Sequence, residues 1–177
     1  MVIFRYQKID MRLLLIVIFI CLSYTTVSQT YVSASHSLAN IPGTIADKSN
    51  LSIEVGRQWD VFSVGFDYGK TSLGNITGKD TTQYIEIRPN LNIFQQGKFS
   101  NTITAGIGYV FGTEQSLLTE FTSGIEYAYT PTLHFNVMFG QFYYSGLKTS
   151  STETFFGVSI MYFFKPYKLH SIIKQNN

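Results

Sequence analysis

The chain has 177 residues, of which 14% are charged and 16% aromatic, with 14 Gly and 4 Pro. Disordered proteins are rich in charge and poor in aromatic residues, so this composition excludes a chain that is disordered throughout. No block of five or more like charges occurs, which argues against a nucleic-acid partner. The length suits one domain of ordinary size.

Residues 1–28 predict a removable export signal. Basic residues precede the ten-residue apolar run Leu13–Leu22, and Thr26-Val27-Ser28 supplies small residues for cleavage before Gln29. An uncleaved anchor is the alternative, but about 20 apolar residues are needed to span a bilayer. Cleavage leaves ten basic residues, ten acidic residues and no cysteine. A disulfide scaffold, a cysteine metal site and a thiol nucleophile are therefore excluded.

After residue 28 the chain alternates between apolar and polar residues, which is the period of a β-strand with two different faces. In the third such segment, Phe62, Val64, Phe66 and Tyr68 share one face. The sequence predicts eight strands in chain order, at Tyr31–Leu38, Leu51–Arg57, Val61–Lys70, Tyr84–Phe94, Thr102–Phe111, Leu117–Tyr129, Leu133–Tyr144 and Thr154–Phe164.

The connections alternate in length, which places the longer ones at one end of the structure. Longer loops are expected at Ala39–Asn50, Thr71–Thr82, Gly112–Ser116 and Ser145–Glu153. Tight turns are expected near Gln58-Trp59, Gly97-Lys98 and Thr130-Pro131. An even number of strands joined in this way predicts an eight-stranded antiparallel up-and-down β-barrel. Closure also removes the two exposed edges of an open sheet.

Three features favour a transmembrane barrel, with apolar side chains outside, over a soluble one. The polar face is rich in Gly, Ser and Thr, as a crowded eight-stranded interior requires. Tyr and Trp lie near strand ends on the apolar face, which is typical of interfacial aromatic belts. Ten tilted residues also span roughly 25 Å, close to the apolar band of such barrels. A soluble lipocalin-like barrel with a ligand cavity remains the alternative.

Ionisable residues on the polar face predict a buried network in the lumen. Because unpaired buried charges are costly, the carboxylates need partners, and Arg88 is the expected hub, bridging Glu54, Glu86 or Glu120. A gated ion path is the functional alternative. The predicted lumen polar network comprises Glu54, Asp67, Glu86, Arg88, Glu120, Glu126 and His134.

The last strand carries the most specific signal in the chain. Gly157, Ile160 and Tyr162 stand in Gly-x-x-Φ-x-Φ spacing, with Phe164 two residues further on, although Phe155 occupies a position that is usually polar. This pattern resembles the assembly signal of small eight-stranded outer-membrane proteins of the OmpA/OmpX-like class, in the variety common among Bacteroidota. The resemblance implies a bacterial outer-membrane barrel over residues 29–164 and a periplasmic tail over residues 165–177.

The same resemblance implies outer-membrane lipids, lipopolysaccharide and the barrel-assembly machinery as partners, and a monomeric protein. No cofactor, metal cluster or phosphate-binding loop is expected. Two histidines are weak catalytic candidates: His134, expected to face inward near Glu126, and His36, which lies between Ser35 and Ser37. We therefore expect a non-enzymatic barrel with a structural or adhesion-like role for its external loops. A lipid A-modifying enzyme is the alternative.

Overall fold

The computed structural model describes residues 28–39, 48–71, 82–111, 115–146, 150–166 and 173–174. The predicted signal lies outside these ranges apart from Ser28, as do most of the long loops predicted at Ala39–Asn50 and Thr71–Thr82. Within the described ranges, no helix has the length and apolar character needed to cross a bilayer.

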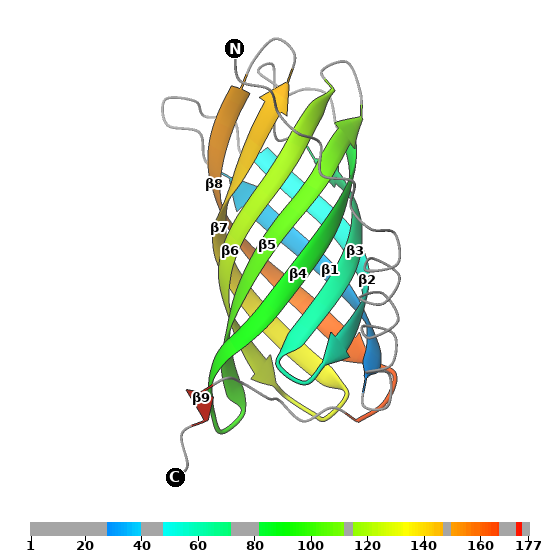
Figure 1. Ribbon diagram of the computed structural model, residues 1–177, viewed down its shortest axis with the longest axis vertical. Coiled ribbons are helices and arrows are strands. Elements are labelled where there is room, and N and C mark those ends of the chain that lie inside the picture. Colours follow the sequence, from blue (N-terminus) through cyan, green and yellow to red (C-terminus); the bar gives the residue numbers. More distant parts are fainter. Residues whose placement is uncertain are drawn as a thin grey trace, which may run out of the picture.

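Eight strands close into one barrel (Figure 1). Each consecutive pair is antiparallel, and β1 pairs with β8 to complete the ring. All strand edges of the ring are therefore paired within the chain, as a transmembrane sheet requires. The strands are β1 (Gln29–Ala39), β2 (Lys48–Trp59), β3 (Phe62–Thr71), β4 (Thr82–Gln96), β5 (Phe99–Phe111), β6 (Ser116–Ala128), β7 (Leu133–Gly146) and β8 (Ser150–Phe163).

The apolar side chains point outward and the polar ones inward. Leu51, Phe121 and Phe139 are 61%, 61% and 60% exposed, whereas Ser100 and Thr102 are 0% and 1% exposed. This is the reverse of a soluble barrel, and an apolar outer surface of this kind is stable in a bilayer. The prediction of an eight-stranded antiparallel up-and-down transmembrane β-barrel is confirmed.

Several strand ends differ from those that alternation predicted. The loop expected over Ser145–Glu153 is mostly strand, because β7 continues to Gly146, β8 begins at Ser150, and Ser145 pairs with Ser150. The turn expected near Gln58-Trp59 lies instead at Asp60-Val61, where Asp60 has a φ of 50°. Ser and Thr fit a strand and a loop equally well, so alternation among them cannot mark an end.

A short ninth strand, β9 (Ile173–Lys174), lies within the region predicted as a tail. It pairs in parallel with Phe94 and Gln95 of β4. These two residues lie beyond Leu91, where the pairing of β4 with β3 ends, so this part of the β4 edge faces no barrel strand. Figure 1 shows β9 beside the lower end of β4.

Glycines on the inner wall leave room for large side chains of neighbouring strands. A Cβ on Gly56 would lie 2.2 Å from the ring of Tyr31, and one on Gly65 would lie 1.9 Å from the carboxylate of Glu54. Neither distance is compatible with a side chain on the glycine. The lumen is therefore filled by pairing a large residue with an adjacent glycine.

Candidate functional site

The centre of the lumen holds a charged cluster around Arg88. Its Nη1 lies 2.8 Å from Oε2 of Glu54 on β2, and its Nη2 lies 2.8 Å from Oε1 of Glu120 on β6. Tyr31 donates to the other oxygen of Glu54, and Thr122 donates to Glu120 at 2.5 Å. One guanidinium thus joins strands on opposite sides of the barrel, with charge-assisted bonds that are stronger than neutral ones.

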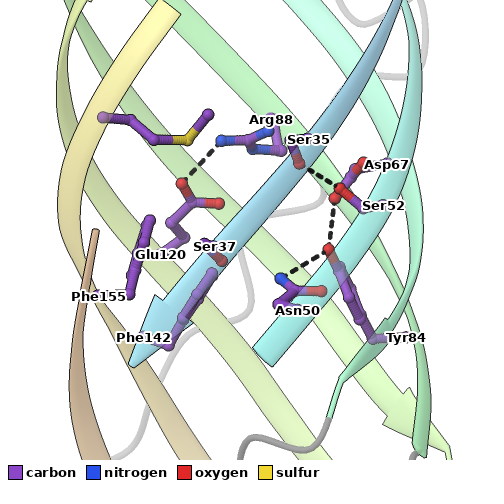
Figure 2. A pocket seen from close by; sticks show the side chains of 11 residues that line it. Ser35, Ser37, Asn50, Ser52, Asp67, Tyr84, Arg88, Glu120, Phe142 and Phe155 are labelled. Atoms are coloured by element: carbon purple, nitrogen blue, oxygen red, sulfur yellow. Dashed lines mark hydrogen bonds and ion pairs between the residues drawn. The ribbon is translucent and has the colours of Figure 1, made fainter. Parts of the chain in front are cut away.

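A second chain of polar contacts runs through Asp67. The Tyr84 hydroxyl donates to Oδ2 of Asp67 at 2.7 Å, and Nδ2 of Asn50 donates to that hydroxyl at 3.1 Å. Ser35 and Ser52 hydroxyls lie 2.7 Å apart nearby. Figure 2 shows these contacts beside the Arg88–Glu120 ion pair.

Glu86 lies among these groups but forms no ion pair with Arg88. It is 1% exposed, and its side chain interacts with the neighbouring carboxyl of Glu120. Its Oε1 lies over Gly106, only 2.0 Å from where a Cβ would be, and next to Glu120. Arg88, expected to bridge Glu54, Glu86 or Glu120, is therefore bonded to the first and last of these.

Strand register explains why so many carboxylates meet here. Glu54, Asp67 and Glu86 are direct cross-strand neighbours on β2, β3 and β4. Like charges in opposed positions destabilise a sheet, and the single Arg88 lies one inward position further along β4. Six carboxyl side chains are buried in the described strands, together with Arg88 and His134. The buried acidic groups therefore outnumber the buried basic ones.

His134 lies in a separate contact near the short-turn end. Its side chain is 0% exposed, with Nδ1 2.5 Å from Oε1 of Glu126 and its ring 4.7 Å from that of Phe163. A buried imidazole packed in this way can stabilise the lumen but has no access to a lipid substrate.

His36 is positioned quite differently from the serines beside it. It is exposed on the outer face, whereas Ser37 is buried and the Ser35 hydroxyl bonds inward to Ser52. Adjacent residues of a strand point to opposite faces. The three residues therefore do not form one catalytic group.

Apolar side chains close the lumen above and below the charged centre. Toward the long-loop end, the Phe142 and Phe155 rings stack at 4.1 Å, as Figure 2 shows. Toward the short-turn end, Tyr31, Met161 and Phe163 form a second buried cluster. The cavity between Arg88 and the Phe142 and Phe155 rings measures about 10 Å³, no more than the space of one water molecule.

The sequence analysis missed several residues that fill the lumen. Glu153 is 4% exposed on β8, but it fell in the predicted loop just before that strand. Tyr84 is 2% exposed and shares the inner face of β4 with Glu86 and Arg88, but the predicted lumen network does not include it. Phe155 takes a usually polar, inward-facing position in the last strand, where its ring stacks on that of Phe142.

The predicted assembly signal divides between the two faces of β8. Gly157 is buried against Ser37 and Met138. Ile160, Tyr162 and Phe164 are 52%, 46% and 63% exposed on the outer face. Within the described residues, no group of three or more His, Cys, Asp or Glu side chains is arranged to hold a metal ion.

Comparison with solved structures identifies the class of fold. A de novo designed transmembrane β-barrel superposes with a TM-score of 0.56 at 11% identity, over 76% of this chain and 94% of the design. Neisserial surface protein A gives 0.52 at 16% identity, over 75% of this chain and 96% of that chain. The N-terminal β-barrel domain of Pseudomonas aeruginosa OprF gives 0.52 at 13% identity, over 76% and 97% respectively.

The chain therefore has the fold of the small eight-stranded transmembrane barrels. The resemblance to the OmpA/OmpX-like class is confirmed at the level of the fold. No protein-family model and no curated protein matches the sequence.

Proposed function

We propose that this protein is a non-enzymatic, integral barrel of the bacterial outer membrane, with a structural or surface-interaction role carried by its external loops. The observation that supports this most directly is the filled lumen. Aromatic clusters lie at both ends of a central ion-pair network, which supports an interior that contributes stability and does not serve as a path for solutes.

The outward apolar band supports a location within a bilayer, and the export signal and last-strand pattern support the outer membrane. Surrounding lipids and lipopolysaccharide, together with the barrel-assembly machinery, are the partners that such a location implies. Recognition of an extracellular partner then falls to the loops over Ala39–Asn50 and Thr71–Thr82.

The first experiment is electrophoresis of the outer-membrane fraction in SDS, with and without boiling. A closed barrel satisfies its strand hydrogen bonds internally, so it resists SDS until heated. We expect a boiling-dependent mobility shift in that fraction. A periplasmic protein with no shift would contradict the proposal.

The surface-interaction role is tested by replacing residues 40–47 and 72–81 with scrambled sequences of the same composition. We expect the barrel to keep its boiling-dependent shift and to lose adhesion to host cells or to other bacteria. Unchanged adhesion would leave only the structural role.

The enzyme alternative is tested by mass spectrometry of lipid A from cells that express the protein. His134 is fully buried, and the serines beside the outward-facing His36 do not share its face, so neither histidine belongs to a catalytic group that reaches lipid A. We expect an unchanged spectrum. A new lipid A species that disappears in His36→Ala or His134→Ala would overturn the non-enzymatic assignment.

A further inference from the structure

The outer face of β3, β4 and β5 contains a groove of about 260 Å³. Its side-chain walls are formed by Phe66, Ile85, Ile87, Ile107 and Tyr109. Ile85 is only partly exposed and forms the floor, whereas Phe66, Ile87 and Ile107 stand out as its walls at 52%, 51% and 55% exposure. The groove opens onto the bilayer-facing surface, where a hydrocarbon chain is the available occupant.

Strand register arranges this face in three cross-strand rows of increasing polarity toward the long-loop end. The first row is Phe66, Ile87 and Ile107, and the second is Tyr68, Ile85 and Tyr109. The third row is Lys70, Gln83 and Phe111, in which Lys70 and Gln83 are exposed. Apolar, aromatic and cationic groups therefore follow one another along the barrel wall.

Tyr109 marks the level at which the groove reaches polar surroundings. Its hydroxyl donates to Oε1 of Gln115 at 3.0 Å, and its ring packs against Phe111 at 5.2 Å. Tyrosine prefers the membrane interface because its ring is apolar and its hydroxyl polar. Lys70 is exposed on the outer face of β3, two residues beyond Tyr68 toward the long-loop end.

We propose that the outer face of β3, β4 and β5 binds a lipid whose phosphate-bearing headgroup has a net negative charge, with one acyl chain in the groove and the headgroup at Lys70. The inference rests on the proposed integral membrane barrel and assigns its lipid partner a specific site. The acyl chain is buried against Ile85, and the Lys70 ammonium selects an anionic headgroup. A lipid at this position also covers the backbone of the β4–β5 pair.

The test uses tryptophan reporters in a Trp59→Phe background, which removes the only native tryptophan. Phe66→Trp places a reporter in the groove wall. Phe139→Trp is the matched control, because Phe139 is also 60% exposed on the outer face but lies on β7, four strands away around the ring. Both proteins are reconstituted in phosphatidylcholine vesicles containing a minor fraction of dibrominated phosphatidylglycerol or dibrominated phosphatidylcholine.

We expect the groove reporter to be quenched with a roughly fivefold preference for the anionic lipid, the effect of one lysine near a lipid headgroup. The preference should vanish in Lys70→Gln and be absent at Phe139→Trp. Equal quenching by both lipids at the groove, or a preference that survives Lys70→Gln, would overturn the site. If the protein were not a membrane barrel, the result would be different from failure of the lipid site, because neither reporter would then be quenched by any brominated lipid.

Discussion

Arg88 is the residue on which the central network depends, because it bonds to carboxylates of two other strands. Its contacts with Glu54 and Glu120 are both 2.8 Å long and nearly shielded from solvent. A buried ion pair adds little compared with a well-packed apolar pair, but removal of one partner leaves an uncompensated charge. The two carboxylates thus make Arg88 hard to replace.

We expect Arg88→Met to lower the free energy of unfolding by about 3–5 kcal/mol, because two buried carboxylates lose their cation. Urea unfolding in lipid vesicles, followed by Trp59 fluorescence, measures the loss. Lys98→Met is the control, since Lys98 is exposed in the β4–β5 turn and a change below about 1 kcal/mol is expected there. A large conductance with unchanged stability would show that Arg88 serves an ion path.

Glu86 and Glu120 are neighbouring carboxylates with different surroundings, so the same substitution should affect them differently. Glu120 accepts from Arg88 and Thr122, whereas Glu86 lies against Glu120 and forms no ion pair among the described residues. We expect Glu120→Gln to lower the urea midpoint and Glu86→Gln to leave it unchanged or raise it, because the second change removes one of two adjacent buried carboxylates. A lower midpoint for Glu86→Gln would mean that Glu86 holds an interaction of its own.

At the scale of the elements, the β4–β5 ladder is the one barrel ladder with an internal interruption in the described strands. Its pairing passes from Ile87 with Ile107 to Asn90 with Thr104 and omits Arg88 and Pro89. The Asn92 N–H donates to the carbonyl of Val61, on the β3 side of β4. Backbone N–H groups of successive strand residues point to opposite neighbours, so the backbone nitrogen of residue 89 faces β5. Proline has no N–H, and the ladder loses a bond there.

We expect Pro89→Val to stabilise the barrel by about 0.5–1.5 kcal/mol, because a valine N–H can donate to the carbonyl of Ala105. The measurement is the temperature at which the boiling-dependent shift occurs in SDS. Pro131→Val is the control, since Pro131 lies in the β6–β7 turn and its replacement adds no ladder bond. A lower transition temperature for Pro89→Val would show that the local break is required for packing.

At the scale of the whole molecule, the barrel is a filled cylinder with an apolar exterior. Aromatic clusters lie at both ends of the charged centre, and the cavity lined by Arg88, Phe142 and Phe155 measures about 10 Å³. Eight strands leave an interior just wide enough for side chains. Any interaction with large molecules therefore belongs to the outer surface or the loops.

In planar bilayers we expect the protein to show no stable porin-sized conductance steps. Phe142→Ala with Phe155→Ala should not create them, because Tyr31, Met161 and Phe163 still close the other end. Phe139→Ala on the outer face is the matched control. Stable large steps from the unmodified protein would contradict a lumen closed by side chains.

Particular elements show how far the sequence predicted this architecture. The alternation in β3 and β5 identified their inner and outer faces, because half-buried strands separate polar and apolar residues residue by residue. β8 begins earlier than alternation predicts, at Ser150, because its first Ser and Thr residues show no apolar–polar alternation. The assignment of residues 1–28 as a signal and of residues 165–177 as a periplasmic tail stays a prediction.

The sequence by itself determined the number of barrel strands and the up-and-down topology, because both depend on local alternation and connection length. It also indicated the apolar exterior, through the small residues of the polar face and the aromatic residues near strand ends. Only the tertiary structure decided that Arg88 bonds to Glu54 and Glu120 but not Glu86. It also decided that Phe142 and Phe155 stack inside the lumen and that three strands together form the outer groove. These contacts depend on the register and closure of strands distant in sequence, which local periodicity does not specify.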